Sequence, residues 1–149
     1  MTFLLALLPL TVFAQLDPGI VWLKRNPGAK ELVLDRFEPT SFFPKYHFVV
    51  LDCATLRKNI RISDIAVTGT LTTGDKKSWL EGLITSADKP GISPVPTPNF
   101  PNPTDFKLYI AVPKSQVGTT GNVQINLKAT VQEPGKAPYQ QTFKVFVQR

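Results

Sequence analysis

The chain has 149 residues, with 17 Lys and Arg against 11 Asp and Glu, a formal net charge of +6 and one cysteine. This length fits a single domain that folds without obligatory disulfides or a structural metal, and one cysteine excludes an intramolecular disulfide. The basic residues are interleaved with acids and form no block of like charge. They predict weak, salt-sensitive attraction to acidic polymers and no specific nucleic-acid site.

The first fourteen residues, MTFLLALLPLTVFA, form an apolar run that ends in the small residue Ala14. Such a run is typical of a secretory signal peptide, and it is too short to cross a bilayer as a helix. No Lys or Arg precedes it, and an uncleaved apolar arm packed on the domain is the alternative. We predict a signal peptide over 1–14 and one domain over 15–149, secreted, periplasmic or at the cell surface. No transmembrane segment is expected in the mature chain.

Short strands are predicted in the first part of this domain. GIVWLK (19–24) and KELVLDRF (30–37) are two candidates, separated by the turn signal NPGA. KYHFVVLD (45–52) is a nearly continuous apolar run, which is typical of a central strand covered on both faces. Cys53 follows directly, so we expect a buried, unreactive thiol, with an intermolecular bridge as the alternative.

The next two strands show a change of phase. NIRISDIAVTGTLTT (59–73) places apolar residues at even positions, 60 and 62, and then at odd positions, 65 and 67. This shift predicts a β-bulge near Ser63 and Asp64. KSWLEGLIT (77–85) is shorter, and the apolar neighbours of Trp79, like those of Trp22, assign that side chain to the core.

A proline-rich stretch, GISPVPTPNFPNPTD, occupies positions 91–105, and six of the chain's fourteen prolines fall between 90 and 103. Prolines at 94, 96 and 98 do not line one face of a three-residue polyproline turn, which disfavours a recognition ligand. Too few residues follow for a second domain. We therefore expect a stiff loop inside one domain, which its prolines keep from pairing as a strand.

Three strands are predicted after this loop. DFKLYIAVPK (105–114) alternates and ends at Pro113, while GNVQINLKATVQE (121–133) and YQQTFKVFVQ (139–148) flank the turn EPGKAP. We read the last two as a hairpin. Its register should place Leu127 opposite Phe143, because the next even register would set Lys128 against Lys144.

The order of these last elements is similar to the end of Ig-like modules: a strand, a Gly-bearing turn, a long alternating strand and a terminal partner. This similarity covers residues 106 to 148, and the Cys–Trp–Cys signature of antibody domains is absent. With no helix of ordinary length predicted, the fold class is all-β: a single antiparallel Ig-like β-sandwich of seven or eight strands with a long Pro-rich loop.

Catalytic and metal-binding patterns are missing from the sequence. His47 is the only histidine, no GxSxG occurs, and Cys53 lies six residues after His47, about 20 Å away if the strand continues. The acids are scattered singly and show no calcium-loop pattern. We predict no enzyme activity, no catalytic residue, no cofactor and no metal.

Four aromatic side chains are the candidate interface: Phe100 on the proline-rich loop, Tyr109, Tyr139 and Phe146. Tyr109 and Phe146 interrupt polar strand faces, and exposed aromatics mark an interface. The favoured hypothesis is a non-catalytic structural or adhesive module at a cell or particle surface, with a protein partner or self-assembly through edge strands, such as the terminal strand if it lies at an edge. The alternative is a module that binds carbohydrate, another ligand or an acidic polymer through exposed aromatics.

Overall fold

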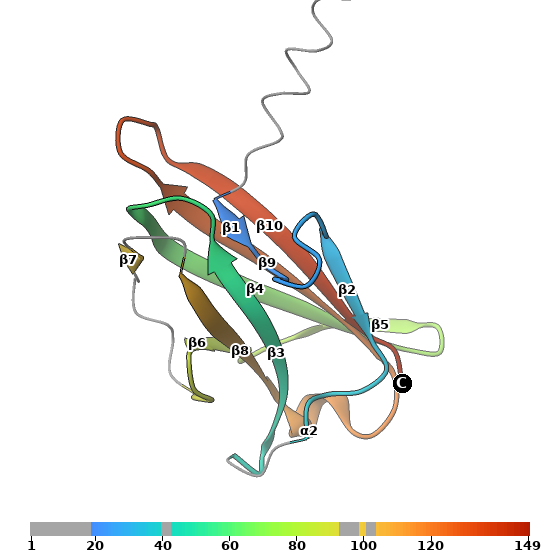
Figure 1. Ribbon diagram of the computed structural model, residues 1–149. Coiled ribbons are helices and arrows are strands. Elements are labelled where there is room, and N and C mark those ends of the chain that lie inside the picture. Colours follow the sequence, from blue (N-terminus) through green and yellow to red (C-terminus); the bar gives the residue numbers. More distant parts are fainter. Residues whose placement is uncertain (1–18, 40–42, 93–98, 101–103) are drawn as a thin grey trace, which may run out of the picture.

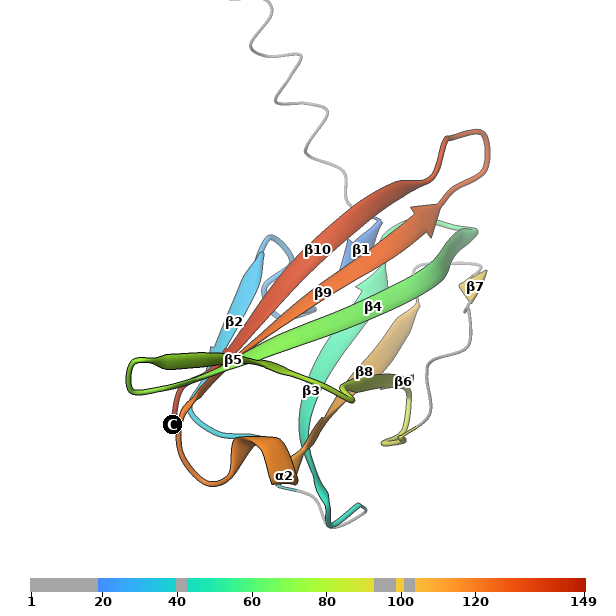
Figure 2. The same ribbon diagram turned by 180° about the vertical axis from the view of Figure 1, so that it is seen from behind.

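The computed structural model describes residues 19–39, 43–92, 99–100 and 104–149. The predicted signal peptide over 1–14 lies outside these residues. Two β-sheets pack face to face, which confirms the predicted all-β, Ig-like sandwich (Figures 1 and 2). In the described part of the chain, no helix is long and apolar enough to cross a membrane.

The four-stranded sheet has the order β1-β3-β8-β6, and the six-stranded sheet has the order β2-β10-β9-β4-β5, with β7 paired to β4. The first sheet comprises β1 (Ile20–Val21), β3 (Tyr46–Thr55), β6 (Ile84–Ala87) and β8 (Asp105–Pro113). The second comprises β2 (Glu31–Leu34), β4 (Ile60–Thr73), β5 (Lys76–Leu80), β7 (Asn99–Phe100), β9 (Asn122–Gln132) and β10 (Tyr139–Val147). A single helical turn, α2 (Lys114–Val117), follows β8.

The core lies between the two sheets because the central strands alternate as the sequence predicts. Alternate residues of β9 are buried while their neighbours are not, and Leu127 pairs with Phe143 in the expected register. Each fully buried side chain of this size contributes about 1.5–3 kcal/mol of hydrophobic stabilisation. Trp22 is 4% exposed and stacks on Phe143, with ring centroids 5.6 Å apart. Trp22 is therefore a core residue, as expected.

The predicted buried thiol is also confirmed. Cys53 is fully buried and forms no disulfide. Its sulfur donates to the carbonyl oxygen of Trp22 at 3.3 Å. Burial raises the pKa of the thiol to about 12, so Cys53 is unreactive in the folded protein.

The β-bulge predicted in β4 is present. Pairing with β9 shifts register between Ile62 and Asp64, and Ser63 is the extra residue. Because of this insertion, Ile62 is buried and Ile65 also packs against the core, although their positions differ in parity.

The N-terminal strands cross from one sheet to the other. β1 pairs antiparallel with β3, whereas β2 pairs parallel with β10, which the sequence analysis did not predict. The terminal strand β10 pairs with β9 along its whole length and with β2 over Lys144–Val147, so its last four residues are not the free edge that the self-assembly hypothesis considered.

The proline-rich connection runs from β6 to β8 within one domain, as expected. Its described part nevertheless pairs: Asn99 and Phe100 form β7, opposite Arg61 and Ile60 at the start of β4. The expectation that prolines keep this loop from pairing is therefore wrong at this point, because neither paired residue is itself a proline. Residues 93–98 and 101–103 lie outside the described residues.

The assignment of Trp79 to the core is wrong. Trp79 is 71% exposed. The stretch KSWLEGLIT contains two strands, β5 and β6, which belong to different sheets. Gly82 lies between them with φ +76°, a conformation that favours glycine, and turns the chain from one sheet to the other. Leu80 faces the core and Trp79 faces outward.

Candidate functional site

Figure 2 shows the five main strands of the six-stranded sheet side by side. The outer face of this sheet carries a row of side chains that runs across all five. Strand register aligns Val33 with Phe146, Phe146 with Gln124, Gln124 with Thr70 and Thr70 with Trp79. These residues point away from the core, since their neighbours in each strand pack into it. Trp79 thus ends a continuous outward row at the β5 edge.

A hollow of about 400 Å³ lies at the Trp79 end of this row. Thr70, only 7% exposed, forms its floor, and Trp79 stands on one side. Gln124 and Asn126 line the other side, where Gln124 Nε2 donates to Asn126 Oδ1 at 3.1 Å. The full lining is Thr70, Lys77, Ser78, Trp79, Gln124 and Asn126. The indole of Trp79 on β5 and the two amides on β9 thus lie on either side of β4. At the usual strand spacing, β5 and β9 are about 10 Å apart.

Lys77 supplies the only charge in this lining. Within the described part of the chain, no acid comes within ion-pair distance of Lys77. Asp75 lies in the β4–β5 turn, and Asp64 lies six residues before Thr70, about 20 Å along β4. The hollow therefore combines an exposed indole, two amides, the Thr70 hydroxyl and an ammonium group without an ion-pair partner among the described residues. An apolar ring face beside a few polar groups is the combination that small-molecule and sugar sites use.

The three predicted interface residues whose side chains the structure describes do not come together. Tyr109 is half-buried on the outer face of the four-stranded sheet, edge-on to Phe48 with centroids 6.5 Å apart. Phe146 is half-buried on the outer face of the opposite sheet, beside Gln124. Tyr139 packs against the core, and the side chain of Phe100 lies outside the described residues. Phe146 alone belongs to the row that leads to Trp79.

Sequence reasoning missed Trp79, because β5 carries no clear signal of which face is solvated: Lys76 and Lys77 occupy both parities. Leu83 and Ile84 were counted in the same strand as Trp79, whereas they follow the change of sheet at Gly82.

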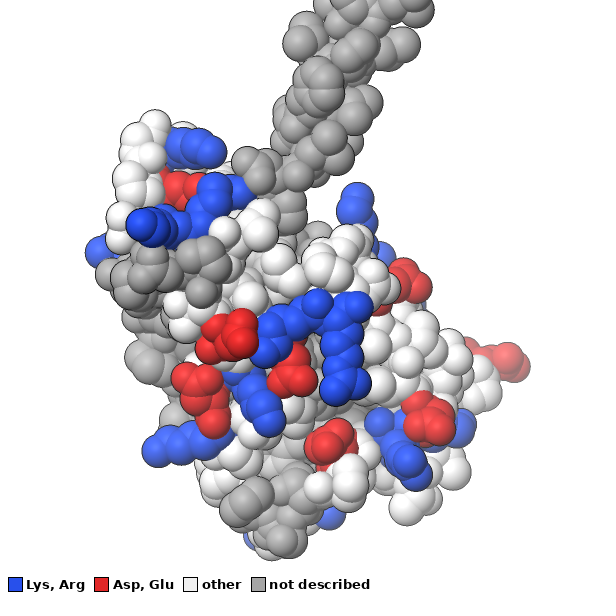
Figure 3. All heavy atoms as spheres, in the orientation of Figure 1, with Lys and Arg blue, Asp and Glu red and all other residues white. Residues whose placement is uncertain are grey.

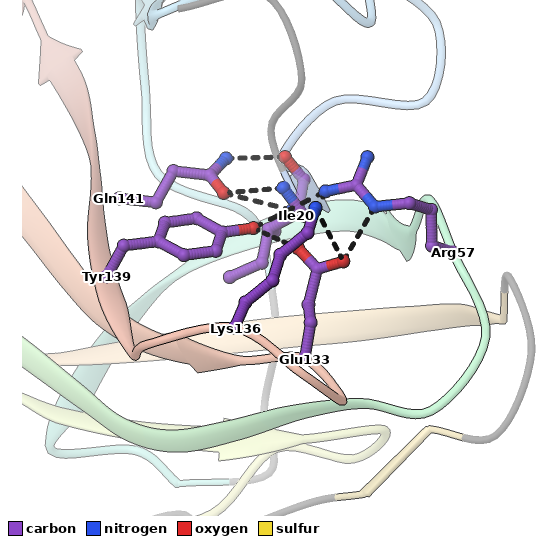
Figure 4. A network of polar contacts seen from close by, with 7 residues as sticks. Ile20, Arg57, Glu133, Lys136, Tyr139 and Gln141 are labelled. Carbon is purple, nitrogen blue, oxygen red and sulfur yellow. Dashed lines mark hydrogen bonds and ion pairs between the residues drawn. The ribbon is translucent and has the colours of Figure 1, made fainter. Parts of the chain in front are cut away.

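A polar network closes one end of the sandwich (Figure 4). Arg57 donates to both carboxylate oxygens of Glu133, from Nε at 2.8 Å and from Nη2 at 2.7 Å, and the Tyr139 hydroxyl donates to the same carboxylate at 2.6 Å. The hydrogen bond from Arg57 lowers the pKa of Glu133 to about 2, and burial raises the pKa of Tyr139 to about 12. Because Arg57 and Tyr139 already donate hydrogen bonds to the Glu133 carboxylate, we interpret this cluster as structural.

His47 lies at the opposite end of the four-stranded sheet. Its ring stacks on Phe37, with centroids 4.5 Å apart and planes within 7°. Burial lowers its pKa below the usual value, so it is neutral at neutral pH. Among the residues that the structure describes, no group of three His, Cys, Asp or Glu side chains is placed to hold a metal ion.

The outer face of the four-stranded sheet differs from that of the six-stranded sheet. Figure 3 shows basic and acidic side chains side by side over β3 and β8. Lys24 Nζ lies 3.0 Å from Asp105 Oδ2, and Asp52 pairs across the strands with Lys107. The charges on this face compensate one another, so it presents no field of one sign.

No family model and no curated protein matches this chain. Among solved structures, PapD-like domain 7 of human CEP192, an ASH/PapD-like domain, is similar with a TM-score of 0.53 and 7% identity over 80% of both chains. A family 123 glycoside hydrolase from Clostridium perfringens has a TM-score of 0.43 and 9% identity, over 78% of this chain and 22% of that one. The first likeness shows the fold alone: the chain is an Ig-like β-sandwich module.

Proposed function

We propose that this protein is a non-catalytic adhesive module, exported to a cell or particle surface, that binds polysaccharide through the hollow beside Trp79. One observation carries the proposal: a tryptophan that is 71% exposed stands over an amide-lined hollow instead of in the core. Aromatic rings offer a flat apolar face, and a few polar groups beside it fix the orientation of a ligand. A sugar ring, apolar on its faces and polar at its edge, matches both.

The edges of the sandwich favour this binding role over self-assembly by strand addition. β1 has two residues, β2 and β6 have four each, and β5 has five, two of which are lysines. Short, charged edges resist pairing with another chain. A binding role is also compatible with the positions of His47 and Cys53, which lie away from the hollow.

The test is affinity electrophoresis through gels that contain single polysaccharides, neutral and acidic. We expect at least one of them to retard the protein, and Trp79→Ala to lose the retardation. Removing a central aromatic contact costs about 2 kcal/mol or more, roughly thirtyfold in affinity. Leu56→Ala is the matched control, because Leu56 is an exposed apolar residue outside the hollow.

Fluorescence supplies a second readout of the same site. The chain has two tryptophans, and only Trp79 is exposed. Ligand binding should therefore change the emission of the exposed indole and leave that of Trp22 unchanged. Retardation of Trp79→Ala equal to that of the wild type, or no retardation by any polysaccharide, would contradict the proposed function.

A further inference from the structure

Lys77 and Trp79 stand two residues apart on the same face of β5. Side chains at this spacing lie about 7 Å apart along a strand, which is close to the length of one sugar unit. Both line the hollow, and Lys77 has no ion-pair partner among the described residues. The ammonium group is therefore available to a ligand whose ring rests on the indole.

The sheet around the hollow has a positive excess. Lys128 on β9 and Lys144 on β10 share the outer face with Lys77. Of the described acids on the strands of this face, Glu31 lies at the far edge, paired with Lys144, and Asp64 lies opposite Thr130. A face that carries more lysines than acids attracts polyanions over a distance of about one Debye length.

The amide pair leaves hydrogen-bonding capacity that a sugar edge satisfies. Gln124 Nε2 donates to Asn126 Oδ1. Within the described residues, this leaves the side-chain oxygen Oε1 of Gln124 to accept a hydrogen bond and the side-chain nitrogen Nδ2 of Asn126 to donate one. Sugar hydroxyls both donate and accept, so they complement the two groups.

We propose that the ligand of this hollow is an acidic polysaccharide, whose ring stacks on Trp79 while its carboxylate or sulfate pairs with Lys77. The inference rests on the proposed function and names its ligand class. A neutral glycan offers the ammonium group only hydroxyl acceptors, whereas an anionic one gains an ion pair with a shorter and stronger hydrogen bond.

The experiment compares polysaccharides that differ only in charge. Polygalacturonate is set against its fully methyl-esterified form, and dextran sulfate against dextran, with dissociation constants from Trp79 fluorescence at low and high salt. We expect the charged member of at least one pair to bind roughly tenfold tighter or more, since hydrogen bonds to charged groups contribute about 1.5 kcal/mol or more. The pair that shows the difference distinguishes a carboxylate from a sulfate ligand.

Lys77→Gln should remove most of the preference for the charged polysaccharide, which means a roughly tenfold weaker affinity for it. The salt dependence of binding should also become weaker. Lys76→Gln is the matched control, because it removes the same charge from the neighbouring position of opposite parity in β5, outside the lining. Circular dichroism confirms that both variants fold.

The outcomes separate the two proposals. Equal binding of charged and neutral members, abolished by Trp79→Ala in affinity electrophoresis and unaffected by Lys77→Gln in the fluorescence titration, overturns the acidic ligand and leaves the proposed function standing. Equal losses in Lys76→Gln and Lys77→Gln show attraction by net charge alone and also overturn it. No binding to any polysaccharide overturns both.

Discussion

Glu133 shows how one buried carboxylate stabilises the end of the sandwich. Its side chain is 5% exposed and is held by Arg57 and Tyr139. The pKa of Glu133 is lowered to about 2 in the folded protein, against about 4.3 in an unfolded chain. A lowered folded-state pKa stabilises the fold above the unfolded value, and this contribution is lost as the pH falls through about 2.

Glu133→Gln should therefore destabilise the protein by about 3 kcal/mol at pH 7, because the variant lacks the charge that Arg57 binds. The difference from the wild type should shrink below pH 4 and be nearly gone at pH 2. Urea unfolding followed by circular dichroism at pH 7, 4 and 2 measures this. Glu81→Gln, at an exposed glutamate, is the control. A variant as stable as the wild type at pH 7 would show that the Arg57 pair does not contribute.

At the scale of elements, the short strand β1 depends on one side chain from the opposite sheet. Gln141 Oε1 accepts from the backbone nitrogens of Gly19 and Ile20 at 3.1 and 3.0 Å, and Gln141 Nε2 donates to the Ile20 carbonyl at 2.6 Å. Gly19 permits this approach, since a Cβ there would lie 2.6 Å from the Tyr139 hydroxyl. A β10 side chain thus joins β1 to the six-stranded sheet.

Gln141→Ala should release β1 with a loss of about 2 kcal/mol, because three hydrogen bonds to a partly buried backbone disappear. Hydrogen exchange should then quicken at Ile20 and Val21, while the amides of β9 keep most of their protection. Gln140→Ala, at the exposed neighbouring position, is the control. Unchanged exchange at Ile20 in Gln141→Ala would show that pairing with β3 alone holds β1.

These elements also show where sequence reasoning succeeds. The Leu127–Phe143 register and the bulge near Ser63 were predictable, because burial of one face fixes the parity of a long strand. The parallel pairing of β2 with β10 was not, since four residues without clear alternation do not specify which sheet they join. Trp79 was misplaced for a related reason: parity cannot be carried across Gly82, where the chain changes sheets.

At the scale of the whole molecule, the two outer faces differ in how their charges are arranged. The four-stranded face neutralises its own charges, as in the Lys24–Asp105 ion pair. The six-stranded face keeps Lys77 uncompensated beside an exposed indole. The β4–β5 hairpin that carries both residues projects beyond the body of the sandwich (Figures 1 and 2). The hollow thus lies at the β5 end of the six-stranded sheet, on the face turned away from the four-stranded sheet.

The edges and the net charge together predict the state of the protein produced by its natural host. The outermost strands β1, β2, β5 and β6 have two to five residues each, and a net charge of +6 opposes association. The protein should therefore be a monomer, and under the proposed export its mature chain should lack residues 1–14. Size-exclusion chromatography with light scattering measures the first property, and the intact mass measures the second. An oligomer that grows with concentration would favour assembly as the function. An intact mass that includes Met1 to Ala14 would contradict export. The hollow beside Trp79 would then be a proposed binding site in another compartment.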